Sequence, residues 1–170
     1  KHGVDSRCED GWHLGARESI YVNDDIRPDR NFFYAAKSKL RYLDKGNLAL
    51  VKSSVGCPYK CSFCYCRLLN EKHFIPAEYE KMIEEMESID ADYYWVVDDV
   101  LFSAREEALK FIDIIEKRKA KLNIIGYLRA DFICREKDLL GKLRKAGLVE
   151  VITGFETAEN RELKDYKKTT

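Results

Sequence analysis

The sequence lacks the features that would place the protein in a membrane or on a nucleic acid. No apolar stretch approaches the ~20 residues that a membrane-spanning helix needs. Lysine and arginine together number 30, and aspartate and glutamate also number 30, so the formal net charge is zero. That balance gives no indication of a nucleic-acid partner or of a charged membrane surface. The first residues are polar and charged, so no secretory signal peptide is visible.

The cysteines are few and unevenly placed. Four of the six lie between Cys57 and Cys66, which argues against a disulfide scaffold and favours a reducing cytoplasm. At 170 residues, 45% of them apolar, the chain has enough material for one domain with a hydrophobic core. Because the sequence begins at Lys1 and stops at Thr170 without a clear ending, we expect a piece of a longer protein.

From residue 48 onward, segments with the character of strands alternate with segments of helical periodicity. Ser103, with Glu106 three residues later, predicts a capping box at the start of the second helix. Gly147 predicts a C-terminal cap for the third helix. The expected strands are 48–55, 93–97, 122–128 and 148–153, and the expected helices are 76–89, 103–119, 138–146 and 157–166.

This alternation predicts an α/β fold in which parallel strands are joined by right-handed helical crossovers. Residues 47–170 would form this domain. Glycines, a proline and polar runs interrupt any long period in residues 1–46, so we expect a linker or the tail of an upstream domain there, with a short helix at 32–42. The loops that follow the strands should gather at one edge of the sheet, where barrel enzymes place their chemistry.

Three cysteines stand directly after the first expected strand, at Cys57, Cys61 and Cys64. An iron–sulfur cluster usually takes four cysteines, so a set of three leaves one iron without a protein ligand. An open position on a metal usually serves chemistry. A zinc site is the alternative, but zinc usually takes four ligands from two cysteine pairs, and here the second pair is missing.

The spacing CxxxCxΦC, in which Φ is the aromatic Phe63, resembles the signature of the radical SAM family. The resemblance implies that Cys57, Cys61 and Cys64 hold a [4Fe-4S] cluster whose open iron is chelated by the amino and carboxylate groups of S-adenosylmethionine. It also implies that an electron, delivered by a donor such as flavodoxin or ferredoxin, breaks a carbon–sulfur bond and yields a 5′-deoxyadenosyl radical. The fold it implies is a partial TIM-type (β/α) barrel of six strands, apparently truncated here after about four β/α units.

Polar residues follow the other three expected strands, and the resemblance makes them candidates for binding the cofactor. Asp98 and Asp99 follow the second strand, where a carboxylate can accept hydrogen bonds from the α-ammonium group. Arg129 follows the third strand and could bind the cofactor carboxylate or substrate, or pair with Asp131. Glu156 follows the fourth strand, where it could reach the ribose hydroxyls or the amine, or act as a helix N-terminal acid.

Cys66 lies two residues beyond Cys64 and has no assigned role in this pattern. An inert core residue is the commoner fate of a buried thiol. A fourth cluster ligand is the other alternative, although it would contradict the open iron.

A finer resemblance is to the branch of the family that carries a cobalamin-binding domain ahead of the radical SAM core. It rests on residues 51–67, 96–99, 128–133, 154–156 and 163–170, with a lead-in at 27–30 and 41–43. Members of that branch often methylate unreactive carbon or phosphorus, so the resemblance implies a cobalamin-dependent methyltransferase or a relative. Cobalamin would bind through a domain that is not in this chain.

Two other functions stay open at this point. One is a methylthiotransferase-like radical SAM enzyme, and the other is a non-enzymatic zinc-binding module. The substrate is unknown, and we expect a small molecule. Because part of the barrel is missing, we expect the isolated chain to cleave S-adenosylmethionine poorly or not at all.

Overall fold

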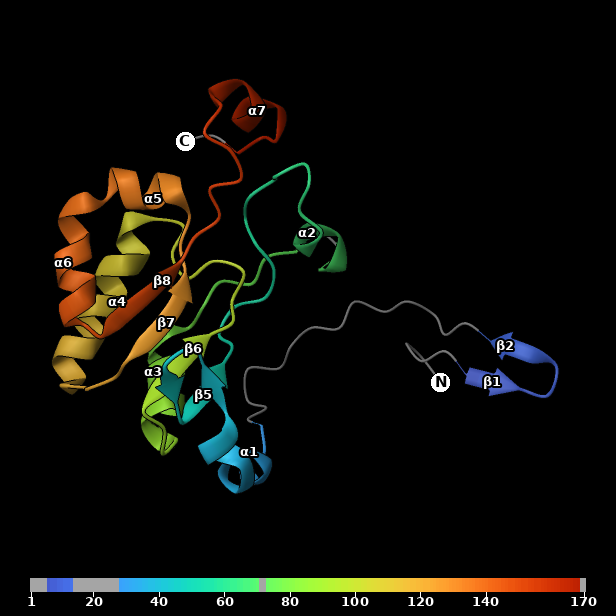
Figure 1. Cartoon of the computed structure of the whole chain (residues 1–170), viewed down its shortest axis with the longest axis horizontal. Coiled ribbons are helices and arrows are strands. Elements are labelled where there is room, and N and C mark those ends of the chain that lie inside the picture. Colours follow the sequence, from blue (N-terminus) through green and yellow to red (C-terminus); the bar gives the residue numbers. More distant parts are fainter. Residues whose placement is uncertain (1–5, 14–27, 71–72, 169–170) are drawn as a thin grey trace.

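The computed structural model describes residues 6–13, 28–70 and 73–168. Its centre is a parallel sheet of four strands in the order β5-β6-β7-β8, shown in Figure 1. The strands are β5 (Leu48–Val51), β6 (Tyr93–Val96), β7 (Ile124–Tyr127) and β8 (Leu148–Ile152). The order of the strands in the sheet follows their order in the chain, so each connection leads to the adjacent strand, as expected for successive β/α units.

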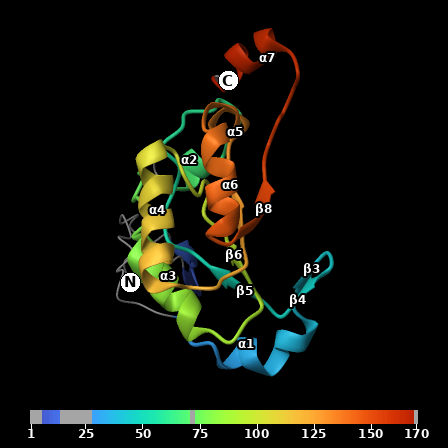
Figure 2. The same ribbon diagram turned by 90° about the vertical axis from the view of Figure 1, so that its left-hand side faces the viewer.

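Three helices cover one face of this sheet: α3 (Tyr79–Ser88), α4 (Arg105–Arg118) and α6 (Lys137–Lys145). Figure 2 views the molecule from this side, with the helices in front of the strands. The shorter helices are α1 (Asn31–Ala36), η1 (Lys37–Lys39), α2 (Cys66–Leu69), α5 (Ala130–Arg135) and α7 (Asn160–Asp165). Two small antiparallel pairs complete the described residues: β1 (Ser6–Cys8) with β2 (Gly11–His13), and β3 (Arg41–Tyr42) with β4 (Lys45–Gly46).

The core lies between the sheet and these helices, and aromatic side chains fill its middle. Phe102, Phe111 and Phe132 are fully buried, and the ring centroids of Phe102 and Phe111 lie 5.4 Å apart. Tyr79 joins them from α3, and its buried hydroxyl donates a hydrogen bond to the carbonyl of Leu101 at 3.0 Å. That bond satisfies a polar group that would otherwise destabilise an apolar core.

The predicted alternation of strands and helices is confirmed, but several details differ. The first strand ends at Val51 rather than at residue 55, because the chain turns away to form the cysteine loop. The predicted helix at 32–42 is wrong in its second half, where η1 ends at Lys39 and Arg41–Tyr42 pairs as β3. The helix α5, between β7 and α6, was not predicted.

The predicted capping box also needs a correction. The partner of Ser103 is Glu107 rather than Glu106. One carboxylate oxygen of Glu107 accepts hydrogen bonds from the backbone N–H of Ser103 at 2.6 Å and of Ala104 at 3.1 Å. Because α4 begins at Arg105, one residue later than the sequence pattern suggests, the third helical position falls on Glu107. Gly147 is confirmed as the left-handed residue after α6, with φ +100°.

The carboxyl ends of the four strands lie at one edge of the sheet, and backbone hydrogen bonds continue the strand order there. The N–H of Val97 bonds to the carbonyl of Val51 at 2.9 Å. The N–H of Leu101 bonds to the carbonyl of Tyr127 at 2.8 Å. The loops after β5, β6 and β7 therefore leave the sheet side by side. No helix among the described residues is long and apolar enough to cross a lipid bilayer.

The aromatic core provides a test of the packing. Replacing Phe111 by Ala should lower the free energy of unfolding by about 3–5 kcal/mol, because the ring is fully buried and the cavity it leaves cannot collapse completely. Leu109, on the same helix, is 40% exposed and serves as the matched control. Leu109→Ala should change stability by no more than about 0.5 kcal/mol. Urea unfolding followed by circular dichroism measures both, and equal losses would contradict the packing described here.

Candidate functional site

The cysteine loop leaves the sheet at the end of β5 and returns to it through a single bridge. The N–H of Val55 bonds to the carbonyl of Ile75 at 3.0 Å, and the N–H of Ile75 bonds back at 2.9 Å. Gly56 follows with φ +75°, a conformation that a residue with a side chain rarely adopts. A Cβ at Gly56 would lie 2.3 Å from the carbonyl oxygen of His73. The loop therefore depends on glycine at its first position.

Three thiols project from this loop at Cys57, Cys61 and Cys64, and all three are free and half-buried. Burial raises the pKa of the Cys57 thiol, and the negative charge of Asp99 adds to the rise. Within the part of the chain that the structure describes, no three cysteine, histidine, aspartate or glutamate side chains converge on a point that could hold one metal ion. A cubane cluster makes a different demand, since each of its irons takes its own thiolate. Three thiols on one loop supply ligands for three of the irons, so the donor set fits a cubane with one open iron.

Arg129 reaches the cysteine loop from the end of β7. Its guanidinium carbon lies 3.9 Å from the centroid of the Tyr59 ring. Nη1 donates to the sulfur of Cys61 at 3.4 Å, and Nε donates to a carboxylate oxygen of Asp131 at 2.8 Å. Burial works against its charge, but the bonds to Asp131 and Cys61 leave the pKa of Arg129 above its usual value. The ion pair with Asp131 that the sequence left open is therefore present, together with contacts that the sequence did not indicate.

The two adjacent aspartates after β6 have different surroundings. Asp98 is buried, and its two carboxylate oxygens accept bonds from the backbone N–H of Ser53 at 2.8 Å and from its hydroxyl at 2.6 Å. Asp99 is half-buried and lies close enough to Cys57 and Cys66 to raise the pKa of both thiols. Asp98 thus ties β6 to the start of the cysteine loop, whereas Asp99 faces the thiols.

Cys66 lies at the start of α2, directly after the loop. Burial raises the pKa of its thiol to about 12, and Asp99 and the Cys64 thiol contribute to the rise. The position of Cys66 outside the CxxxCxΦC spacing favours the interpretation that its thiol does not bind the cluster.

The segment after β8 runs back over the cysteine loop. The N–H of Ser62 bonds to the carbonyl of Tyr166 at 2.8 Å, and the rings of Phe63 and Tyr166 meet edge to face with centroids 5.5 Å apart. The amino group of Lys168 lies 5.9 Å from the centroid of Phe63. In both views α7 lies beyond the edge of the sheet at which the strands end (Figures 1 and 2). The loop is therefore contacted by a segment about 100 residues further along the chain.

Lys168 also fixes Glu156. The buried amino group donates to a carboxylate oxygen of Glu156 at 2.7 Å and to the carbonyl of Gly154 at 2.8 Å. Glu156 has φ +59°, the left-handed conformation that is uncommon for a residue with a side chain. Backbone strain of this kind tends to persist at functional sites, where the surrounding contacts hold it.

The structure thus brings most of the predicted site residues to one edge of the sheet. Phe63 lies within the cysteine loop, and Asp99 and Arg129 lie against its thiols. Glu156 binds Lys168, whose amino group lies near the Phe63 ring, while Asp98 is engaged by Ser53. The sequence pattern indicated no role for Tyr59 or Lys168. Tyr59 could have been noticed as a second aromatic residue within the cysteine motif. Nothing local distinguishes Lys168 from the other lysines near it.

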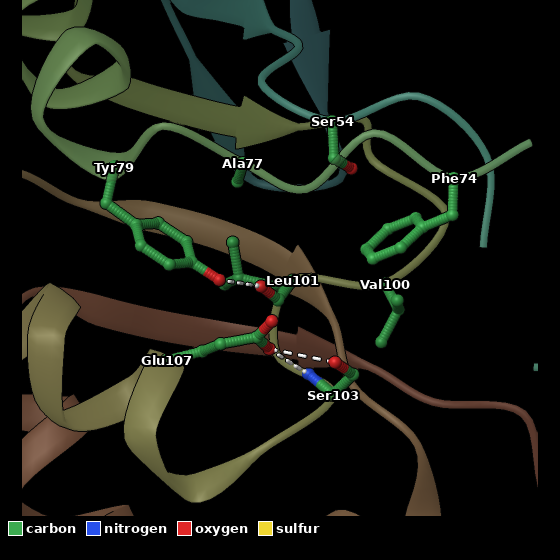
Figure 3. A pocket seen from close by; sticks show the side chains of 8 residues that line it. All are labelled: Ser54, Phe74, Ala77, Tyr79, Val100, Leu101, Ser103 and Glu107. Carbon is green, nitrogen blue, oxygen red and sulfur yellow. Dashed lines mark hydrogen bonds between the residues drawn. The ribbon is translucent and has the colours of Figure 1, made fainter. Parts of the chain in front are cut away.

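A small pocket lies beside the loop, but it cannot hold a cofactor. Its volume is about 10 Å³, which is near the minimum that one water molecule needs. Figure 3 shows the pocket, with the Tyr79 hydroxyl bonded to the Leu101 carbonyl and Glu107 bonded to Ser103. The buried hydroxyl oxygen of Ser54 has no protein partner there, so a bound water would satisfy it. The candidate site is therefore the exposed side of the cysteine loop rather than this pocket.

A comparison with protein families agrees with this placement. A sequence profile of the Radical SAM superfamily matches residues 51–170, from the last residue of β5 to the end of the chain. The match includes the cysteine loop and the loops that follow the other three strands.

Known proteins resemble the chain over nearly its whole length. It is 25% identical over 167 residues to the hopanoid C-3 methylase of Methylococcus capsulatus, a match that covers 98% of this chain and 32% of the methylase. The solved structure of OxsB, a cobalamin-dependent S-adenosylmethionine radical enzyme, superposes with a TM-score of 0.68 at 20% identity and covers 99% of this chain and 26% of OxsB. The solved structure of TsrM, a radical S-adenosylmethionine methyltransferase from Kitasatospora setae, superposes with a TM-score of 0.66 at 17% identity. That match covers 99% of this chain and 34% of TsrM.

These likenesses confirm the predicted fold, an α/β sheet that forms part of a TIM-type barrel. The chain spans between about a quarter and a third of the length of the three proteins.

The first position of the cysteine loop provides a test of the site. Gly56→Ala should destabilise the chain by more than about 1 kcal/mol and lower the iron it retains, because the new Cβ would collide with the His73 carbonyl and displace the loop. Gly141→Ala is the control, since a Cβ there meets nothing within 4 Å. Thermal unfolding and iron analysis after anaerobic reconstitution measure the two effects. Wild-type iron retention in Gly56→Ala would show that the loop does not need this conformation.

Proposed function

Because the chain belongs to the radical SAM superfamily, we propose that Cys57, Cys61 and Cys64 hold a [4Fe-4S] cluster whose open iron binds S-adenosylmethionine. The observation that supports this proposal best is the group of three free thiols on one loop, surrounded by polar residues from the ends of β6, β7 and β8. Three thiolates leave one iron open for an external ligand. When bound, the cluster supplies the electron that breaks a carbon–sulfur bond of S-adenosylmethionine.

The surrounding residues have the chemistry to hold a charged cofactor. We assign to Asp99 the α-ammonium group, because it is the aspartate that faces the thiols and a carboxylate binds an ammonium through charge-assisted hydrogen bonds. Phe63 offers its ring to the nucleoside from within the loop. Glu156 can accept hydrogen bonds from ribose hydroxyls, and the buried amino group of Lys168 holds it in place. The segment 154–168 would also exclude water from the loop that it covers.

We further propose that the whole protein is a cobalamin-dependent methyltransferase or a relative. Two of the similar proteins are named as a methylase or methyltransferase, and the third as a cobalamin-dependent radical enzyme. Cobalamin would bind in a domain outside residues 47–170, to which residues 1–46 would be the linker or tail. The electron would come from a donor such as flavodoxin or ferredoxin, and the substrate would be a small molecule. On this proposal the isolated chain cleaves S-adenosylmethionine poorly, and a methylthiotransferase-like activity remains the second enzymatic candidate.

A zinc-binding module is the candidate from another functional class. Metal analysis distinguishes it directly, because a zinc site would give one zinc per chain without sulfide, whereas a single cubane gives about four irons per chain with sulfide.

Removing one thiol tests the assignment of the ligands. Cys61→Ala should abolish retention of the cluster after anaerobic reconstitution, because two thiolates on a loop cannot replace three. Cys66→Ala is the matched control, since Cys66 lies two residues beyond the motif and is not one of the three proposed ligands. Iron, sulfide and zinc are measured on both variants. A full cluster in Cys61→Ala, or its loss in Cys66→Ala, would contradict the assignment.

Measurements of cofactor binding and of stability distinguish the roles of Asp98 and Asp99. Asp99→Asn should weaken the binding of S-adenosylmethionine to the reconstituted chain roughly tenfold, by removing one charge-assisted hydrogen bond. Asp98→Ala should instead lower the free energy of unfolding by about 1–3 kcal/mol, because it leaves the Ser53 N–H without its partner. Calorimetric titration and urea unfolding provide the two readouts. The assignment fails if Asp99→Asn binds the cofactor as the wild type does.

A further inference from the structure

We propose that Arg129 is a positioning residue for the cysteine loop, which it holds through the ring of Tyr59 and the sulfur of Cys61, and that its charge raises the reduction potential of the bound cluster. This inference rests on the proposed function. It differs from the assignment of Arg129 to the cofactor carboxylate that the sequence suggested, because here the guanidinium acts on the loop that holds the cluster.

The guanidinium of Arg129 is held in one direction by the residues that follow it in the chain. Arg129 is the last extended residue before α5, with φ −77° and ψ 146°. Asp131 lies in the first turn of that helix and accepts a bond from Nε at 2.8 Å. Both side chains are about one-tenth exposed, at 10% and 11%. A short helix and a shielded ion pair therefore set the direction in which the arginine fork points.

Tyr59 of the cysteine loop covers one face of the guanidinium. Its central carbon lies 3.9 Å from the centroid of the Tyr59 ring, well within the ~6 Å over which a cation is attracted to an aromatic face. The Tyr59 hydroxyl donates to the carbonyl of Ser103 at 3.3 Å. Tyr59 therefore connects the cysteine loop to the loops that follow both β6 and β7. These contacts restrain the residues between Cys57 and Cys61.

The guanidinium also contacts the sulfur of Cys61. Nη1 of Arg129 lies 3.4 Å from the sulfur of Cys61, within the range of an N–H···S hydrogen bond. Hydrogen bonds to the sulfurs and local charge are two of the determinants of the potential of an iron–sulfur cluster. A reduced cluster carries one more negative charge than an oxidised one, so a nearby cation stabilises the reduced form more. Arginine stays charged at every accessible pH, and Asp131 offsets only part of its field.

Together these contacts already occupy Arg129. Nε and Nη1 are engaged by Asp131 and Cys61, and Tyr59 covers one face of the plane. If two nitrogens of the guanidinium bound the carboxylate of a cofactor, at least one of these contacts would have to break. The contacts made within the chain therefore favour a role in holding the loop.

The test compares variants of the 170-residue chain after anaerobic reconstitution. Arg129→Met should lose its cluster to a chelator roughly tenfold faster than the wild type, and its midpoint potential should shift to more negative values in an EPR-monitored redox titration. Arg129→Lys should not restore the retention, because an ammonium has no planar face to stack on Tyr59. Tyr59→Phe keeps the ring and should retain the cluster, whereas Tyr59→Leu should lose it faster.

Arg118→Met is the matched control, because Arg118 forms ion pairs with Glu84 and Glu87 on α3, away from the loop. It should leave both the potential and the retention unchanged. A wild-type potential and loss rate in Arg129→Met would overturn the inference, most clearly if that variant bound S-adenosylmethionine more weakly. If Arg129→Met fails to fold, Tyr59→Leu provides the test instead. If Tyr59→Leu retained its cluster as well as Tyr59→Phe does, that result would also overturn the inference. A wild-type chain that takes up no cluster would count against the proposed function itself.

Discussion

The position of the cysteine loop depends on contacts with the loops that follow the other three strands. The loop is irregular from Gly56 to Cys64, with few backbone bonds of its own, so neighbouring segments must hold it. Asp98 holds its beginning through Ser53, Arg129 and Ser103 hold Tyr59, and Tyr166 holds Ser62. All of these partners lie at one edge of the sheet because parallel strands end together there. The fold therefore serves the site by bringing four loops together.

Two of the loops at this edge contain a residue in an uncommon backbone conformation. Gly56 and Glu156 both have positive φ, and they lie in the loops that follow the strands at the two ends of the sheet. A non-glycine residue in such a conformation costs about 1–3 kcal/mol and persists only when its surroundings hold it. For Glu156 the surroundings are clear, since Lys168 binds both its carboxylate and the carbonyl of Gly154.

Much of the fold could be predicted from the sequence, because each β/α unit has a strong local pattern. The strand residues Tyr93–Val96 and Ile124–Tyr127 are apolar runs between turns, and the helices carry apolar residues at the expected spacing. One detail that failed depends on where a helix begins: Glu106 and Glu107 are both acids near the start of α4, and only the structure decides which one caps it. The cysteine spacing indicated the site, but the roles of Asp98 and Asp99 differ because of Ser53, and Lys168 is a distant partner that no local pattern could indicate.

The central claim is that three thiolates of this loop leave one iron open to S-adenosylmethionine. The most direct measurement is the EPR spectrum of the reconstituted and reduced chain, recorded before and after S-adenosylmethionine is added. The account predicts the signal of one reduced [4Fe-4S] cluster, with g-values that change when the sulfonium compound binds the open iron. A spectrum with no cluster signal, or one that S-adenosylmethionine leaves unchanged, would contradict it.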